Sequence, residues 1–283
     1  MSAPRFSIIV PTRDRNELLA LCLERLAPGA QTFAGELYEV IVTDDSPTQT
    51  ARDFVATHFP WAHWIAGPRR GPASNRNNGA ARAHGEYLVF IDDDCLPELD
   101  LLAAYDGAIR SDVSTYEGRI TCRERDPSPR ETSPINLHGG VLWSCNFAIR
   151  RDAFDDVRGF DERFPLPHME DTDMRDRILA AGHQIEFVAS ASVDHPPRRL
   201  AWGMRLARIH QAGVLYMFIH PPVRGLPWYL QNQFRARVSV VVHSRKSIDS
   251  LTALASVPFE LLAIALRWRQ WNSWAQATAR MPR

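Results

Sequence analysis

The stretch "YLVFIDDDCLPELD", residues 87–100, joins an apolar run directly to three carboxylates, Asp92, Asp93 and Asp94. The run Tyr87–Ile91 is short and rich in β-branched and aromatic residues, and glycine and proline lie on either side of it, which predicts a buried strand. Three unpaired carboxylates at a strand end repel one another. The fold must therefore place something next to this strand that offsets the repulsion.

The first half of the chain alternates predicted strands with predicted helices. We expect strands at 6–10, 38–43, 62–66 and 87–91, and helices at 14–26, 48–58 and 73–84. Strands separated by single helices form right-handed βαβ units, which place the strands in parallel and cover both faces of the sheet. The pattern therefore predicts an α/β protein.

After residue 97 the pattern is less regular. We expect a helix at 98–109, strands at 114–121 and 140–149, a loop rich in proline and charge at 123–134, a helix at 169–182 with Gly182 as its C-cap, and a strand at 184–188. The chain from Arg198 onward is expected to be mainly helical. The fold class is therefore α/β with a helical C-terminal extension.

Composition excludes several classes of protein. The 283 residues contain 33 basic and 33 acidic side chains, so no overall positive charge favours nucleic acid as a partner. The four cysteines are scattered without a CxxC pair, which predicts free thiols in a reducing cytoplasm. The N-terminal apolar stretch is too short for a signal peptide, so we expect a protein that is not secreted.

Polar clusters follow three of the predicted strands: "PTRDR" from residue 11, "DDSPT" from residue 44, and the triple aspartate. In an open parallel sheet, ligands bind at the carboxyl ends of the strands. Asp44 and Asp45 are equally compatible with turn and N-cap chemistry. For the triplet, an N-cap explains one aspartate but not three. A divalent cation with a phosphate-containing ligand explains all three, and a solvated acidic turn is the alternative.

A second acidic group, Glu170, Asp171 and Asp173, opens the helix predicted at 169–182. Acids at a helix start are stabilised by the helix dipole, which is a purely structural explanation. The alternative is that one of these carboxylates points into a cleft and acts as a general base.

Five stretches together resemble the family-2 glycosyltransferases, which have the GT-A fold. They are "SIIVPTRDR", "EVIVTDDSPT", "GPASNRNNGAARAHGEYLVFIDDDCLP", "CNFAIRRDAFDDVRGFDERF" and "EDTDMRDRILAAG", and they cover about residues 5–195 in the family's order. The resemblance implies a Rossmann-like, mixed but mainly parallel sheet flanked by helices. It divides the chain into a GT-A domain at 1–197, with a nucleotide-binding part at about 1–110 and an acceptor part at about 111–197, and a helical region at 198–283.

The resemblance also assigns expected roles to particular residues. Those expected to bind the nucleotide-sugar donor are Pro11, Thr12, Arg13, Asp44, Asp45, Arg76, Asn77, Asp92, Asp93, Arg198 and Arg199. Asp93 is expected to face the ribose. A cofactor, Mn²⁺ or Mg²⁺, is expected at Asp94, with Asp92 and His195 as further ligands. For His195 the alternative is an ordinary loop residue.

The implied reaction is an inverting glycosyl transfer. Asp171, paired with Glu170, would take the proton of an acceptor hydroxyl, and the metal with Arg198 or Arg199 would stabilise the departing nucleoside diphosphate. One displacement inverts the anomeric carbon, so one base suffices. A sugar-1-phosphate nucleotidyltransferase is an alternative, although it would be expected to have a glycine-rich loop where "PTRDRNE" has none. A non-catalytic nucleotide-sugar-binding homologue is another.

The C-terminal region contains an apolar run at 251–266, interrupted by Pro258 and Glu260. This run is too short and too interrupted for a convincing membrane-spanning helix. Tryptophan beside arginine suits a helix at a membrane interface, and the alternative is a helix packed on the domain or on a dimer partner. Expected acceptors are a glycan, a lipid-linked sugar or a small molecule. The expected location is the cytoplasm, with the inner face of the membrane as a variant.

Overall fold

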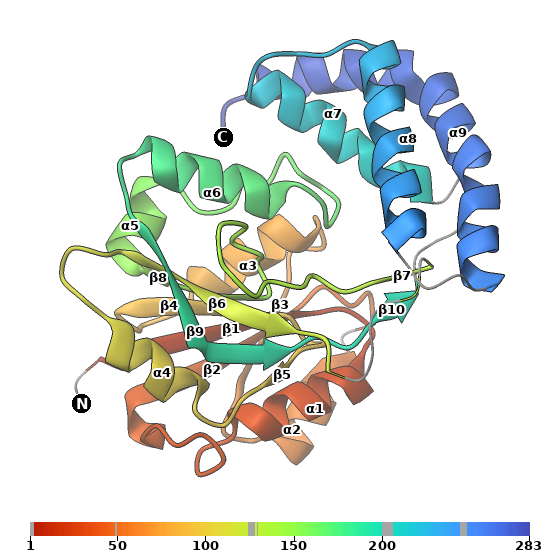
Figure 1. Cartoon of the computed structure of the whole chain (residues 1–283). Helices are drawn as coiled ribbons and strands as arrows, with labels where there is room; N and C mark the ends of the chain where they lie inside the picture. The colour runs from red at the N-terminus through yellow and green to blue at the C-terminus, as the bar shows by residue number, and fades with distance from the viewer. Residues whose placement is uncertain (1–2, 49, 124–127, 129, 200–205, 244–247) are drawn as a thin grey trace. The chain divides into compact units, whose positions relative to one another are not determined.

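The computed structural model describes residues 3–48, 50–123, 128, 130–199, 206–243 and 248–283. The chain divides into two compact units. We call the first the sheet unit; it comprises Met1–Arg123, Pro134–Pro165 and Glu170–Pro196. We call the second the helical unit; it comprises Glu124–Ser133, Leu166–Met169 and Pro197–Arg283. The elements of both are labelled in Figure 1.

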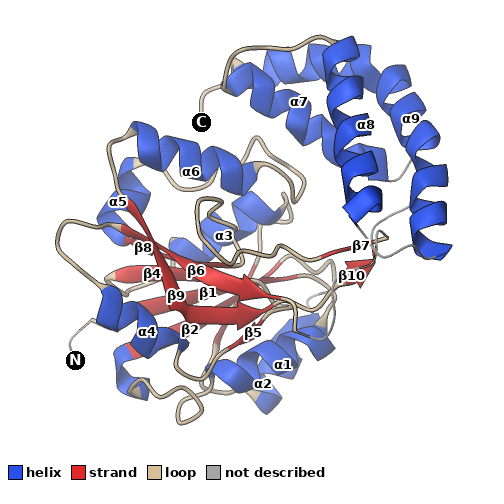
Figure 2. Cartoon of the chain, viewed as in Figure 1, coloured by secondary structure: helices blue, strands red, loops and turns tan. Residues whose placement is uncertain are grey.

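The sheet unit is built on an eight-stranded sheet in the order β3-β2-β1-β4-β8-β6-β9-β5 (Figure 2). The strands are β1 (Phe6–Thr12), β2 (Tyr38–Asp44), β3 (His63–Ala66), β4 (Tyr87–Ile91), β5 (Leu96–Pro97), β6 (Thr115–Thr121), β8 (Asn146–Arg150) and β9 (Ile185–Asp194). β1 pairs in parallel with β2 and β4, and β2 with β3. β8 runs antiparallel to β4 and β6, and β5 antiparallel to β9. The mixed sheet predicted from the sequence is confirmed.

Helices cover both faces of this sheet. They are α1 (Asn16–Leu26), α2 (Thr50–His58), α3 (Pro72–Ala80), α4 (Leu101–Ala108), α5 (Arg151–Asp156) and α6 (Glu170–Ala180). One buried core receives Leu23 of α1 and Leu102 of α4. The core on the other face receives Ala73 of α3, Phe154 of α5 and Ile178 of α6. These two apolar layers fix the strand ends that carry the polar clusters.

The prediction of a strand at 140–149 is wrong in its first half, because β8 begins only at Asn146. Gly139, Gly140 and Leu142 have positive φ angles of 81°, 95° and 49°, so this segment turns instead of extending. The backbone N–H groups of Gly140 and Leu142 donate to the buried Glu117 carboxylate, which takes the place of a strand partner.

Several other boundaries differ from the sequence prediction. Helix α3 ends at Ala80, four residues early, and the backbone N–H of His84 donates to Glu39 Oε1 at 2.6 Å instead of continuing the helix. Helix α5 and strand β5 were not predicted, because six and two residues are too few to show a period. The last predicted strand extends to Asp194.

The helical unit contains α7 (His210–Ile219), α8 (Leu226–His243), α9 (Ile248–Ala279), and the short strands β7 (Glu131–Thr132) and β10 (Arg198–Arg199). Its buried polar centre is Glu260, whose carboxylate is bonded by His210 Nε2 at 2.8 Å and Arg237 Nη2 at 3.0 Å. Parts of the predicted loop at 123–134 and of the region after Arg198 lie outside the described residues.

Helix α9 passes through Pro258 without a break, so Pro258 interrupts the apolar run and not the helix. Of the helices described, it is long and apolar enough to cross a membrane by length and composition, which alone is weak evidence for a span. Its buried face carries Glu260, which a soluble packed helix accommodates by pairing.

Candidate active site

Three parallel strands deliver the polar clusters to one edge of the sheet. β1 and β2 are in register, with Thr12 opposite Asp44, and β4 pairs with the other side of β1. Thr12 Oγ1 donates a hydrogen bond of 2.7 Å to Asp93 Oδ2, which joins the ends of β1 and β4. The strand ends meet as the βαβ pattern predicts.

Two arginines neutralise the aspartate triplet. Arg15 places Nη2 at 2.6 Å from Asp93 Oδ1 and Nη1 at 2.9 Å from Asp94 Oδ2. Arg76 Nη2 lies 2.6 Å from Asp92 Oδ1. Each aspartate therefore has a guanidinium partner, which relieves much of the repulsion between the carboxylates.

Arg15 contacts the triplet and was not among the residues predicted from the sequence. "PTRDR" contains two arginines, and the structure separates their positions: Arg13 is exposed, whereas Arg15 reaches the triplet. The turn between them is set by Asp14, which has a φ of 53° and donates its N–H to Ser46 Oγ at 2.8 Å. No local pattern in the sequence distinguishes the two arginines.

Asp93 is buried and electrostatically costly. Burial raises its pKa to about 7, the Arg15 charge opposes that rise, and the neighbouring Asp94 charge adds to it. Asp93 therefore keeps its proton to a higher pH than an ordinary aspartate does. An ion or ligand that adds positive charge or a hydrogen-bond donor here would favour the charged carboxylate.

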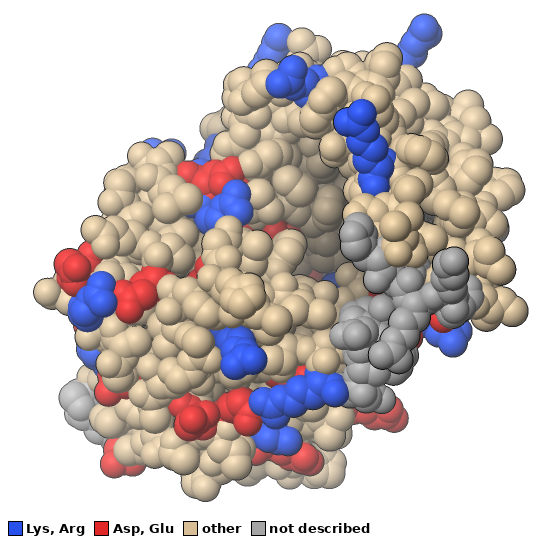
Figure 3. Space-filling view, viewed as in Figure 1, with Lys and Arg blue, Asp and Glu red and all other residues tan. Residues whose placement is uncertain are grey.

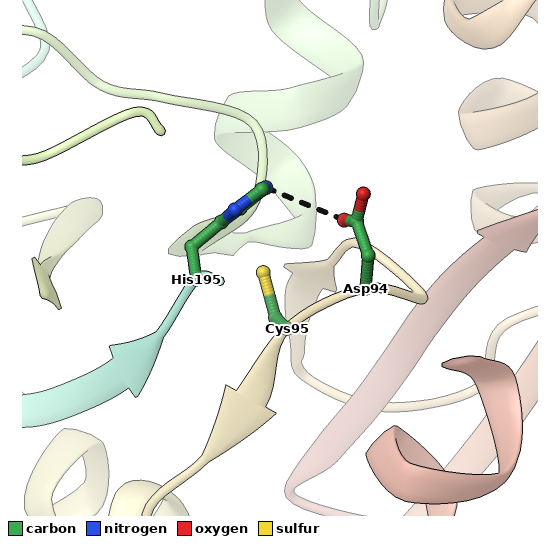
Figure 4. A group of neighbouring side chains, drawn as sticks. All are labelled: Asp94, Cys95 and His195. Atoms are coloured by element: carbon green, nitrogen blue, oxygen red, sulfur yellow. Dashed lines mark ion pairs between the residues drawn. The ribbon is translucent and has the colours of Figure 1, made fainter. Parts of the chain in front are cut away.

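Asp94, Cys95 and His195 lie close enough to hold a metal ion (Figure 4), since one candidate ligand atom from each falls within 4.8 Å of the others. His195 Nε2 is 3.3 Å from Asp94 Oδ1. Burial raises the pKa of the Cys95 thiol well above its ordinary value. Sulfur is also a softer donor than Mn²⁺ or Mg²⁺ prefers, so Cys95 is the weakest candidate ligand of the three. The remaining donors, one carboxylate and one imidazole, fit Mn²⁺ better than Mg²⁺, which prefers oxygen alone.

Arg76 also joins the triplet to the second acidic group. Its guanidinium is buried, with Nη1 at 3.2 Å from Glu170 Oε1 and Nη2 on Asp92. The Phe160 ring lies under it, 5.6 Å from ring centroid to Cζ. Acids 78 positions apart in the sequence, residues 92 and 170, are thus held on one cation.

Asp171 is buried beside Glu170 at the start of α6. Burial raises the pKa of Asp171, while the Thr172 N–H, which donates to Oδ1 at 2.8 Å, and the Arg76 charge oppose the rise. Burial also raises the pKa of Glu170, and the Asp171 charge adds to it. Asp173, by contrast, pairs with Arg177 at 2.8 Å within the helix. Asp173 is thus paired within the helix, whereas Glu170 and Asp171 are both buried close to the Arg76 charge.

The double aspartate after β2 is held by hydrogen bonds within the protein and is closely packed against Gly67. Asp44 accepts the Ser46 N–H at 2.8 Å and Trp64 Nε1 at 3.1 Å, so both its oxygens are bonded within the protein. Asp45 accepts the Arg69 N–H at 2.8 Å, and burial raises its pKa. A Cβ added at Gly67 would lie 2.3 Å from Asp45 Oδ1, which leaves room only for glycine.

The remaining predicted residues lie in different surroundings. Pro11 is buried in β1. Asn77 donates to the Phe160 carbonyl at 2.9 Å and accepts the Phe160 N–H at 2.9 Å, so it braces the segment under Arg76. Arg198 and Arg199 are exposed in β10 of the helical unit, and their role at a diphosphate stays a prediction.

Comparisons with known proteins agree with this geometry. Residues 7–158 match the model of glycosyl transferase family 2, and residues 130–199 match a model described as the N-terminal domain of galactosyltransferase. The validoxylamine A glucosyltransferase of Streptomyces hygroscopicus subsp. limoneus is 37% identical over 262 residues, covering 77% of this chain and 55% of that protein. The pre-mycofactocin glycosyltransferase of Mycobacterium tuberculosis is 26% identical over 212 residues, covering 68% and 43%.

Solved structures share the fold. A mannosyltransferase from Pyrobaculum calidifontis, in complex with GDP-Man and Mn²⁺, has a TM-score of 0.54 at 20% identity and covers 99% of this chain and 74% of its own. Residues 1–349 of S. aureus TarS with UDP-GlcNAc give 0.56 at 17%, covering 97% and 88%. The chain spans about half the length of the two curated relatives. Because the family model covers more than half of the chain, the chain belongs to glycosyltransferase family 2, with the GT-A fold.

Proposed function

We propose that this chain transfers a glycosyl group from a nucleotide-sugar to an acceptor hydroxyl with inversion, using a divalent cation and Asp171 as the base. The observation that carries the proposal is the Arg76 bridge. It holds the triplet at Asp92 and the acidic pair at Glu170 on one buried guanidinium, so a donor site and a base adjoin in a family-2 chain.

On the donor side, the ends of β1 and β2 bind the nucleoside. Thr12 and Arg15 hold Asp93 in place, and Asp93 accepts a hydrogen bond from a ribose hydroxyl. Asp45 and the glycine-lined turn at Gly67 border the base. The raised pKa of Asp93 supports this role, because a hydroxyl donor would favour the ionised carboxylate.

Asp94 and His195 hold the cation, with Asp92 as a further ligand. When bound, the cation neutralises charge on the diphosphate. Arg15 already bonds Asp94 in the protein alone, and it remains close enough to act as a second positive charge at this edge. Arg198 and Arg199 contribute to stabilising the departing diphosphate in this proposal.

Asp171 accepts the proton of the acceptor hydroxyl as that oxygen attacks the anomeric carbon. Its raised pKa supports this role, since a base works best when its pKa is nearer to the working pH than that of an ordinary aspartate. The Arg76 charge opposes the rise in the pKa of both Glu170 and Asp171. One displacement with one base gives inversion.

Relatives and neighbours guide the choice of substrates. The printed names of solved neighbours include GDP-Man with Mn²⁺ and UDP-GlcNAc, and those of curated relatives include glucosyltransferases acting on a small molecule and on a polyprenyl-linked glycan. We propose a nucleotide-sugar of this class as donor and a glycan, lipid-linked sugar or small molecule as acceptor. The buried free cysteines Cys22, Cys95 and Cys145 support a reducing cytoplasm as the compartment.

The test is turnover of a panel of nucleotide-sugars with Mn²⁺ or Mg²⁺, by wild type and Asp171→Asn. Wild type is expected to release nucleoside diphosphate slowly from one donor. The variant is expected to lose roughly 10²-fold or more of this rate, with the Kd for the nucleoside diphosphate unchanged. Asp53→Asn, at an exposed aspartate of α2, is the control and is expected to behave as wild type.

Two results would contradict the proposal at different points. Normal turnover by Asp171→Asn would remove the base assignment and leave the donor site standing. Nucleotide-sugar binding without turnover of any donor would favour the non-catalytic alternative. Formation of a nucleotide-sugar from a sugar 1-phosphate would favour a nucleotidyltransferase.

A further inference from the structure

The C-terminal region has a large positive net charge, although the net charge of the whole chain is zero. Residues 198–283 contain twelve arginines and one lysine but only two acids, Asp249 and Glu260, a net charge of +11. Because the whole chain is neutral, residues 1–197 carry −11. Such an asymmetry indicates a surface that meets an anionic partner.

Helix α9 adds an exposed apolar stripe to this charge. Its members range in exposure from 51% at Phe259 to 78% at Ile248, and they are Ile248, Leu251, Phe259, Leu262 and Leu266. The spacings of three, eight, three and four residues return to one side of an α-helix. A contiguous stripe of this kind marks an interaction site, unlike apolar side chains scattered singly on a surface.

The same side of α9 continues with exposed arginines. Arg269 follows Leu266 by three residues on this side of the helix, and the exposed Arg280 comes directly after the last residue of α9. The face of α8 and α9 visible in Figure 3 is mostly uncharged, with scattered basic side chains. The stripe from Ile248 to Leu266 is about 27 Å long at 1.5 Å per residue.

The opposite side of α9 is fixed inside the helical unit. Ile264 and Trp271 are buried, and Glu260 pairs with His210 on α7 and with Arg237 on α8. A helix crossing a bilayer would have to leave these partners and carry Glu260 into hydrocarbon unpaired. The helix therefore lies along a surface, with its packed side turned to the unit and its stripe turned outward.

We propose that the helical unit docks on an anionic lipid bilayer, with α9 in the plane of the membrane. The apolar stripe enters the boundary between headgroups and acyl chains, and the arginines contact anionic headgroups. A symmetric dimer through this stripe would bring two C-terminal regions, each of charge +11, together, which disfavours it. An anionic polymer such as nucleic acid would contact the arginines but would leave the apolar stripe exposed to water.

The test is co-sedimentation of the full chain with vesicles, which needs no substrate and no catalytic activity. Binding is expected to vesicles with roughly a third phosphatidylglycerol, to weaken severalfold between about 0.1 M and 0.5 M salt, and to be far weaker on pure phosphatidylcholine. Leu262→Gln with Leu266→Gln is expected to lower the partition coefficient by roughly tenfold or more. Arg269→Gln with Arg280→Gln is expected to lower it by roughly 30-fold.

The matched control is Leu21→Gln with Leu179→Gln, two leucines of the sheet unit exposed by 48% and 52%. It is expected to bind vesicles as wild type does. Light scattering and circular dichroism of every variant establish mass and folding. The proposal is overturned if wild type sediments with neither vesicle, or if the stripe variant binds as the control does. It is also overturned if wild type is an oligomer that the stripe variant dissociates.

Discussion

Replacing Arg76 by methionine removes the one cation shared by both acidic groups. Arg76 is 3% exposed, and its partners Asp92 and Glu170 lie at 2.6 and 3.2 Å. Methionine keeps much of the apolar stem and its packing on Phe160 but leaves the carboxylates without their counter-charge. Removing one partner of a buried ion pair typically costs about 3–5 kcal/mol.

The loss should depend on pH in a defined direction. Without Arg76, the pKa values of Glu170 and Asp171 rise further, because the cation that opposed their burial is gone. A carboxyl group whose folded pKa exceeds its unfolded value destabilises the fold as pH rises above the unfolded value. Arg76→Met should therefore lose more stability relative to wild type at pH 8 than at pH 5.5.

Thermal unfolding followed by circular dichroism measures both effects. At about 2–4 °C per kcal/mol for a chain of this size, the midpoint should fall by roughly 6–20 °C. The control is Arg70→Met, whose partner Glu162 lies at 2.9 Å on the surface, and it should change stability by less than about 1 kcal/mol. The Arg76 bridge is refuted if Arg76→Met loses no more stability than Arg70→Met does, or if its loss of stability does not depend on pH.

Two further predictions concern buried carboxylates. Asp93→Asn should stabilise the ligand-free protein above pH 7 by roughly 1–3 kcal/mol and have little effect near pH 4. The reason is that a carboxyl group with a folded pKa of about 7 lowers the stability of the fold as pH rises. The variant should also weaken nucleotide binding. Denaturation at several pH values checks the first part, and greater stability of wild type above pH 7 would contradict it. Glu260→Gln should destabilise the helical unit by roughly 1–3 kcal/mol at pH 7. Burial alone would raise the Glu260 pKa, but the bonds from His210 and Arg237 outweigh it and lower the pKa. The difference from wild type should therefore shrink as pH falls below about 4, and a difference that grows in acid would contradict the assignment.

The strands that carry the site could be predicted because their signals are local. β1, β2 and β4 are short apolar runs that end in polar clusters, and the order of helices and strands gave their parallel arrangement. The meeting of Thr12 and Asp93 follows from that arrangement. The segment before β8 was misjudged because its backbone partner is a side chain, Glu117, and no sequence period reveals such a bond.

The partners of the triplet could not be predicted, because they come from other elements of the fold. Arg15 is 79 residues from Asp94, and Arg76, which is 16 residues from Asp92, lies on helix α3. The sequence indicated a bound cation, and the structure shows arginines already in place on the same carboxylates. Which arginine of "PTRDR" faces the triplet depends on one turn at Asp14.

The membership of residues 166–169 in the helical unit was also not visible in the sequence. Burial, together with the nearby charges of His210 and Arg237, lowers the pKa of His168 to about 4. These partners lie more than 40 residues away in the sequence. The segment leads directly into Glu170 and Asp171, so it joins the two units immediately before the proposed base.

The central claim is that the triplet edge binds a nucleoside diphosphate together with a divalent cation. A thermal-shift panel of nucleoside diphosphates and nucleotide-sugars, with Mn²⁺, with Mg²⁺ and with chelator, tests it most directly. One nucleotide at about 100 times its Kd should stabilise the protein by roughly 2.7 kcal/mol, a rise of about 5–11 °C, with metal present. Asp94→Ala should lose the part of this rise in midpoint that depends on the metal. If no nucleoside diphosphate raises the midpoint with either metal, the claim is contradicted.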